Sequence, residues 1–203
     1  LKSQDHFSED HNNNLLRLPG LAKAFPAARI IIPFRNPLQH AQSLMRQHWN
    51  FCTAQRDDPF IAKYMRWLGH FEFGLDYRPF TFGPGLAPAR KGTDMNQLHL
   101  WVEHWTRVYR GVLDSAPANA IFWDFDAFCS DPKGRIIRLA ECLVLDPDIL
   151  GAAAAGIRQL PDYANNDRLP PAVLADAEQT YAELSRRSHE IFPAHTLAKT
   201  ALR

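Results

Sequence analysis

Apolar residues are arranged in two different patterns along the chain, and each pattern predicts a different kind of element. Two short runs, over residues 28–34 and 120–125, are almost continuously apolar, which is typical of strands buried in a parallel sheet. Elsewhere, apolar residues recur at spacings of three and four, the period of an amphipathic helix. This spacing predicts helices over residues 15–25, 37–50, 58–73, from 93 past 112, from 132 to 143, 152–160 and 171–192.

Prolines, and the residues before them, set the expected boundaries of these elements. A capping side chain that precedes a proline is a typical helix start. Pro19-Gly20 is expected to interrupt the first helix, and Pro33 is expected to weaken the pairing of the first strand. Three predicted helices begin at such a pair, at Asn36-Pro37, Asp58-Pro59 and Asp131-Pro132.

The order of strands and helices predicts an α/β fold, organised as a single domain over residues 1–203. Residues 170–203 are expected to form a C-terminal helical extension of that domain. Two strands do not make an independently stable sheet between helices. Because the chain also begins at Leu1 rather than at a methionine, we expect the domain to be incomplete at its N-terminus.

Composition excludes several classes of protein. Hydrophobic residues make up 46% of the 203 residues and charged residues 22%, which is ordinary for a globular chain. The net charge of +1 gives no support for nucleic acid as a partner, and no apolar run is long enough to span a membrane. Three cysteines without close pairing indicate free thiols in a reducing compartment, so the predicted location is cytoplasmic.

The segment with the clearest chemistry follows the first strand. Arg35 ends the strand, and Asn36-Pro37 begins a helix whose free N–H groups and partial positive charge suit a phosphate. In open α/β sheets, ligands bind at the carboxyl ends of the strands. Ser43 lies about two turns into the helix, on the face of Asn36, so Arg35 and Ser43 are predicted to meet at one dianionic group. The alternative is that the arginine only precedes a helix start and that the serine faces solvent.

The stretch from Phe25-Pro26 through Arg35-Asn36-Pro37 to Ser43 resembles the sulfotransferase family. In that family, a strand after "FP-x-A-[KR]" leads into R-[ND]-P and a serine on the next helix. The resemblance implies that Arg35, Asn36 and Ser43 bind the 3′-phosphate of 3′-phosphoadenosine 5′-phosphosulfate (PAPS), the sulfuryl donor. It also implies a P-loop-like three-layer parallel sheet flanked by helices.

The downstream half extends this resemblance to about residue 145. The strand over residues 121–125, the pair Asp131-Pro132 and the helix that follows look like the family's "YEDL…DP…LxxFLGL" segment. Phe125 replaces the usual tyrosine there and Asp126 the usual glutamate. The family's Gly/Ser/Thr-rich phosphosulfate loop and any Walker loop are missing, so we expect that loop upstream of Leu1. Residues 90–92 look like the family's late RKG motif but precede the YEDL-like segment, so we interpret that match as coincidental.

The resemblance also assigns candidate catalytic residues near the first residue. Lys2-Ser3 resembles a Lys-[ST] pair whose lysine contacts the transferring sulfuryl group, although Lys2 is equally well explained as a solvated residue. A general base must take the proton of the acceptor, and His6 is the candidate by its usual pKa, with Glu9 and His11 as alternatives. No spacing of ligands indicates a metal, so none is predicted as a cofactor.

The predicted function is transfer of a sulfuryl group from PAPS to a hydroxyl or amine acceptor, either a small molecule or a carbohydrate. The aromatic, Pro- and Gly-rich segment over residues 76–93 is a candidate acceptor loop. Two alternatives remain open. One is another P-loop transferase, such as a nucleotide kinase. The other is a non-catalytic helical interaction module, for which the long helix over residues 171–192 suits the contacts of a homodimer.

Overall fold

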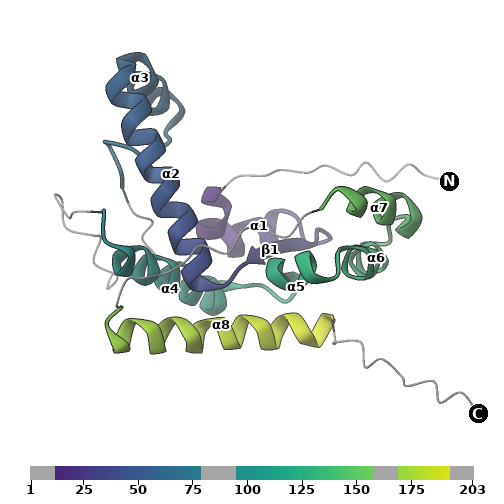
Figure 1. The fold of residues 1–203 in the computed structure, drawn as a ribbon. Coiled ribbons are helices and arrows are strands. Elements are labelled where there is room, and N and C mark those ends of the chain that lie inside the picture. Colours follow the sequence, from purple (N-terminus) through teal and green to yellow (C-terminus); the bar gives the residue numbers. More distant parts are fainter. Residues whose placement is uncertain (1–11, 79–94, 158–168, 193–203) are drawn as a thin grey trace, which may run out of the picture.

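The computed structural model of the chain describes residues 12–78, 95–157 and 169–192. The described residues are mostly helical and include a two-stranded parallel sheet, formed by β1 (Ile30–Phe34) and β2 (Ala120–Asp124). The long helix α8 (Pro171–Ile191) runs along one side and packs on α4 (Leu98–Ser115) and β2 (Figure 1). This arrangement confirms a mixed α/β organisation, whereas the three-layer P-loop-like sheet remains a prediction.

Both strands appear where the apolar runs predict them, but the expectation for Pro33 is wrong. The pairing continues through Pro33, which lies opposite Trp123 in the register. The Ile30 amide donates to the Asn119 carbonyl, and backbone groups alternate in direction along a strand, so the N–H position that Pro33 lacks points away from β2. The outward carbonyl of Pro33 accepts a hydrogen bond from the Tyr109 hydroxyl at 2.7 Å.

The two faces of the sheet pack against different parts of the chain. On one face, Ile32, Phe34 and Phe122 are buried against side chains of α4 and α8. On the other face, Ile121 and Trp123 are covered by the segment from α5 (Phe125–Ser130) to α6 (Pro132–Leu143) and by the end of α8. The face of β1 on that side remains open, since Ile31 is 40% exposed.

The lengths of two helices differ from the predictions. Helix α2 (Pro37–Asp57) continues past the predicted end near Asn50, because its buried positions extend to Gln55. Helix α3 (Pro59–Leu68) stops before the predicted end at Phe73, because Gly69 takes a left-handed conformation with φ of 70°. Asn36 and Asp58 cap these two helices as predicted.

The N-terminal elements also correct one prediction. A 3-10 helix, η1 (Asn12–Arg17), leads directly into α1 (Leu18–Ala24), and the change of helix type lies at that junction rather than at Pro19-Gly20. Pro19 lies in the first turn of α1, where the backbone N–H that it lacks would have no helical partner.

Two short helices in the second half were not predicted correctly. Helix α5 begins directly after β2 because the Asp124 side chain accepts a hydrogen bond from the Ala127 amide at 3.0 Å. Helix α7 (Pro147–Ala153) and the 3-10 turn η2 (Ala154–Gly156) precede most of the range predicted for them, because Asp146 caps a helix at Pro147.

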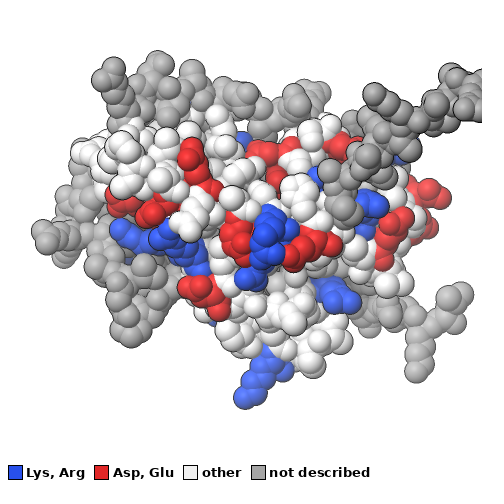
Figure 2. Space-filling view, turned by 90° about the horizontal axis from the view of Figure 1, so that it is seen from below, with Lys and Arg blue, Asp and Glu red and all other residues white. Residues whose placement is uncertain are grey.

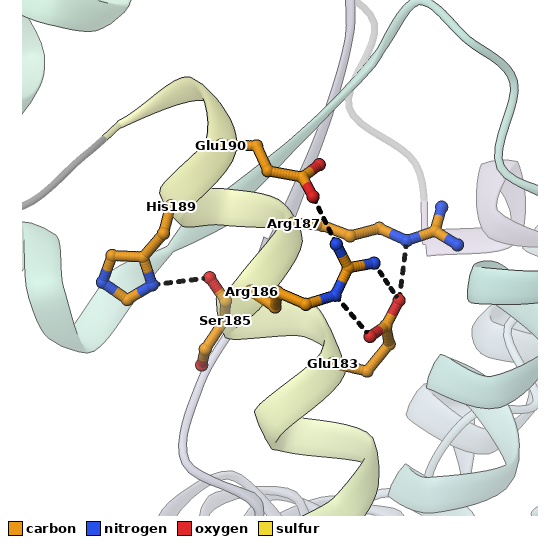
Figure 3. A network of polar contacts seen from close by, with 6 residues as sticks. All are labelled: Glu183, Ser185, Arg186, Arg187, His189 and Glu190. Carbon is orange, nitrogen blue, oxygen red and sulfur yellow. Dashed lines mark hydrogen bonds and ion pairs between the residues drawn. The ribbon is translucent and has the colours of Figure 1, made fainter.

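The outer face of α8 carries a ladder of ion pairs (Figures 2 and 3). Arg186 donates to Glu183 at 2.7 and 2.8 Å and also pairs with Glu190, while Arg187 reaches Glu183 at 3.1 Å. These hydrogen bonds lower the pKa of Glu183 to about 2. The apolar stripe of α8 packs within the chain on α4 and β2, so the surface that suited homodimer contacts is used internally. A homodimer remains a prediction.

Candidate anion-binding site

The candidate site lies where β1 ends and α2 begins. Arg35 follows the last residue of β1, and the Asn36 side-chain oxygen accepts hydrogen bonds from the amides of Leu38 and Gln39 at 3.0 and 3.2 Å. This cap satisfies two of the free N–H groups at the helix start. Asn36 therefore shapes the site mainly through its cap and its own backbone N–H, and its side-chain oxygen is already engaged.

Asp126, which sequence reasoning did not assign to the site, lies against Arg35 and Asn36. One of its oxygens accepts the Asn36 backbone N–H at 2.5 Å, and the other lies 3.6 Å from the Arg35 Nε. Parallel pairing brings the ends of β1 and β2 to the same edge of the sheet, which explains how residues 90 positions apart meet. A carboxylate thus occupies the Asn36 N–H at the start of α2, a donor that a phosphate would use.

Arg35 is largely buried but not fully satisfied. Its side chain is 14% exposed, and its guanidinium carbon lies 6.0 Å from the centre of the Phe125 ring. Within the described part of the chain, the buried Nε has no partner at hydrogen-bonding distance. Because the guanidinium is a planar group with five N–H donors, Arg35 can bind a further acceptor without leaving Asp126.

His40 joins Asn36 and Ser43 on one face of α2, at the spacing i, i+4, i+7. The Trp105 indole N–H donates to His40 Nδ1 at 3.2 Å. Burial, the charge of Arg35 and the neighbouring His104 together lower the pKa of His40 to about 4, and burial has the largest effect. The ring is therefore neutral at pH 7, and its proton is on Nε2, because Nδ1 accepts a hydrogen bond. The helical spacing in the sequence was the signal that could have identified His40.

Ser43 is half-buried on α2, two turns after the cap. Its Cα lies roughly 10 Å along the helix axis from that of Asn36, given the rise of about 1.5 Å per residue. Arg35 and Ser43 make no direct hydrogen bond to each other. The predicted convergence of these two side chains on one group therefore needs a ligand large enough to span that distance.

A second carboxylate lies behind the first. Burial raises the pKa of Asp124, and the nearby charge of Asp126 raises it further, against the effect of its hydrogen bond from Ala127. Across from them, burial and these two carboxylates raise the pKa of the Tyr181 hydroxyl to about 12. Tyr181 also packs edge-on against Phe34, with ring centres 5.8 Å apart. Acidic groups therefore flank Arg35 at this edge of the sheet.

The other predicted site residues are not placed by the structure. Lys2, His6, Glu9 and His11 lie outside the described residues, as does the 90–92 segment. The cysteines were predicted to be small buried thiols; Cys52 is buried, Cys129 and Cys142 are only partly buried, and none of the three is in a disulfide. Among residues 12–78, 95–157 and 169–192, no cluster of three metal-ligating side chains occurs.

Helices in the described ranges are all too short or too polar to cross a membrane. Comparison of the chain with models of known protein families, with curated proteins and with solved structures gave no significant match.

Proposed function

We propose that this chain provides the 3′-phosphate side of a PAPS-binding site in a sulfotransferase. The proposal depends mainly on one observation: Arg35, with its buried Nε lacking a hydrogen-bond partner, lies beside the capped N-terminus of α2 at the carboxyl end of a parallel strand. Such a position suits a phosphate by charge, by donor geometry and by its location in the sheet.

Each residue of the site has a distinct role in this proposal. Arg35 supplies the permanent charge and several N–H donors. The Asn36 backbone N–H supplies a further donor, which Asp126 now uses. His40 contributes a neutral Nε2–H donor one turn into the helix, and Ser43 a hydroxyl one turn further. A phosphate with adjoining ribose is large enough to bridge the spacing along the helix.

Bound PAPS supplies the activated sulfuryl group that an acceptor hydroxyl or amine takes over. The residues of this site act at a distance from that group, by fixing the position of the nucleotide. The acceptor still needs a base and a cation near the reacting atoms, and Lys2 and His6 remain the predicted residues for these roles. The residue pair Asp124 and Asp126 cannot stabilise a developing negative charge, because both are acidic.

The test is calorimetric titration with 3′-phosphoadenosine 5′-phosphate and with the same nucleotide lacking its 3′-phosphate. We expect the protein to prefer the 3′-phosphate form. Arg35→Ala should weaken its binding by about 10- to 100-fold, since hydrogen bonds to charged groups contribute roughly 1.5–3 kcal/mol. Binding of the form without a 3′-phosphate should change little.

Arg29→Ala is the matched control, because Arg29 is an exposed arginine just before the amino end of the same strand. It removes the same charge from the protein without touching the candidate site. Equal weakening by Arg29→Ala and Arg35→Ala would mean that general charge, not this site, attracts the nucleotide. Absence of binding by the parent protein would overturn the proposal.

A further inference from the structure

Helix α3 carries three exposed aromatic rings on one side. Phe60, Tyr64 and Trp67 occur at the spacing i, i+4, i+7 and are 57%, 48% and 65% exposed. The rings contact one another, with Phe60 lying 5.9 Å from Tyr64 and 6.2 Å from Trp67 between ring centres. Lys63 lies among them, with its ammonium 4.9 Å from the centre of the Trp67 ring. We call these four residues the aromatic face.

The packing of the described residues leaves the aromatic face outside the core. The opposite side of α3 is the one that packs inward, through the buried Met65, whose sulfur lies 3.0 Å from the Gln55 side-chain nitrogen of α2. A surface helix with one packed side usually has a polar side facing water. On α3 the outward side is aromatic instead, which indicates that something other than water covers it.

The aromatic face lies at the far end of a projecting hairpin. Helices α2 and α3 extend away from the sheet and from α8, with α3 at the tip (Figure 1). The candidate anion site is at the opposite end of α2, beside Asn36. The face can therefore meet a large flat surface without steric conflict with the rest of the described molecule, and independently of the proposed nucleotide site.

Size and charge argue against a second copy of the chain as the covering partner. Full burial of an aromatic side chain removes about 150–250 Å² from water, so the exposed fractions of the three rings correspond to roughly 250–430 Å². A stable protein interface needs about 800 Å² from each partner. A symmetric contact would also bring the Lys63 side chains of two copies together, while α3 itself has no acidic residue and its Arg66 is already paired with Asp76 at 2.5 Å.

A bilayer surface fits the same features. Tryptophan and tyrosine rings favour the headgroup level of membranes, where an amphipathic ring is partly wet and partly apolar. A lysine beside such rings, as Lys63 is, attracts anionic headgroups. A contact of this kind needs only a few inserted rings on an exposed tip, and no deep pocket. We propose that the aromatic face is a peripheral contact with an anionic lipid bilayer, with its rings among the headgroups and Lys63 at their phosphates.

The test is co-sedimentation of the whole chain with vesicles of phosphatidylcholine alone and of phosphatidylcholine with about 30% phosphatidylserine. We expect binding to the anionic vesicles, which weakens as salt is added, and weaker binding to the neutral ones. The double variant Phe60→Ser/Trp67→Ser should reduce binding to anionic vesicles by about tenfold or more, and Lys63→Glu should reduce it as well.

Ile149→Ser is the matched control, because Ile149 is 70% exposed on α7 and lies outside the aromatic face. It should bind vesicles as the parent does. All the changed side chains are largely exposed, so circular dichroism should show unchanged folding. Absence of vesicle binding by the folded parent, or equal loss in the control, would overturn the proposal. Sedimentation velocity showing a dimer that Phe60→Ser/Trp67→Ser dissociates would overturn it in favour of a second copy.

Discussion

Val144 is expected to destabilise the protein, so its replacement by glycine should stabilise it. Val144 ends α6 with φ of 57° and ψ of 41°, in the left-handed region, where β-branched residues are rarely found. Its amide donates to Glu141, and the next amide, of Leu145, donates to Ala140 at 2.9 Å. This hydrogen-bond pattern is a Schellman motif, in which the left-handed position is usually glycine.

The size of the effect follows from two opposing contributions. The left-handed conformation costs an L-residue roughly 1–2 kcal/mol, and glycine escapes this cost. Glycine also loses about 0.4–1 kcal/mol more on folding, because its unfolded chain is freer. The valine side chain is 83% exposed, so its removal sacrifices little buried apolar area. The free energy of unfolding should therefore rise by roughly 0.5–1 kcal/mol in Val144→Gly, from the difference between these contributions.

Urea denaturation measures this change. The midpoint should rise while the dependence of the unfolding free energy on urea stays constant, and the melting temperature should rise by about 1–4 °C for a chain of this size. Ile149→Gly is the control for glycine itself, because it lies within helix α7 and should destabilise by about 1 kcal/mol. If Val144→Gly is as stable as the parent or less so, with an unchanged urea dependence, the strain assigned to Val144 is wrong.

Three further perturbations test the site and its support. Asp126→Asn should strengthen binding of 3′-phosphoadenosine 5′-phosphate by about three- to tenfold in calorimetry, because it removes the negative charge beside Arg35 and Asn36; unchanged or weaker binding would contradict this. Tyr109→Phe should lower the free energy of unfolding by roughly 1 kcal/mol, through loss of its hydrogen bond to Pro33. His40 has a pKa lowered from 6.5 to about 4, so the unfolded chain binds the extra proton first. The contribution of neutral His40 to the free energy of unfolding is therefore complete above pH 6.5. It falls by up to roughly 3 kcal/mol as the pH drops towards 4. In His40→Gln, the urea midpoint should depend less on pH over that window.

Local chemistry explains the elements that could be predicted from the sequence. The caps at Asn36, Asp58 and Asp131 involve side chains that bond to amides two or three positions on, so the sequence contains both partners of each bond. The apolar runs of β1 and β2 were likewise sufficient, because a buried strand needs no distant residue to be recognised. The predicted boundaries failed where a short-range signal was overlooked, as at Gly69.

Long-range packing explains what could not be predicted. The pairing of Arg35 with Asp126 depends on which strands are neighbours, and the sequence around either residue contains no trace of the other. The short helix α5 has few residues of its own, and its position is secured by Phe128, which packs on Trp123 at 5.2 Å between ring centres. The tautomer of His40 also depends on the indole of Trp105, a hydrogen-bond donor 65 positions away.

The register of the sheet decides which groups surround the candidate site. Phe34 pairs with Asp124, so the residues that follow them, Arg35 and Asn36 on one strand and Phe125 and Asp126 on the other, emerge together at the carboxyl edge. A slip of one residue would turn every side chain to the other face and separate this set. Any anion that binds here must compete with the carboxylate of Asp126 for the Asn36 N–H. A singly charged carboxylate ligand would gain little from that exchange, whereas a dianionic phosphate offers more charge and more acceptor oxygens. The carboxylate of Asp126 also repels a dianion more strongly than a monoanion, so its replacement by asparagine should help a 3′-phosphate more than it helps a carboxylate ligand.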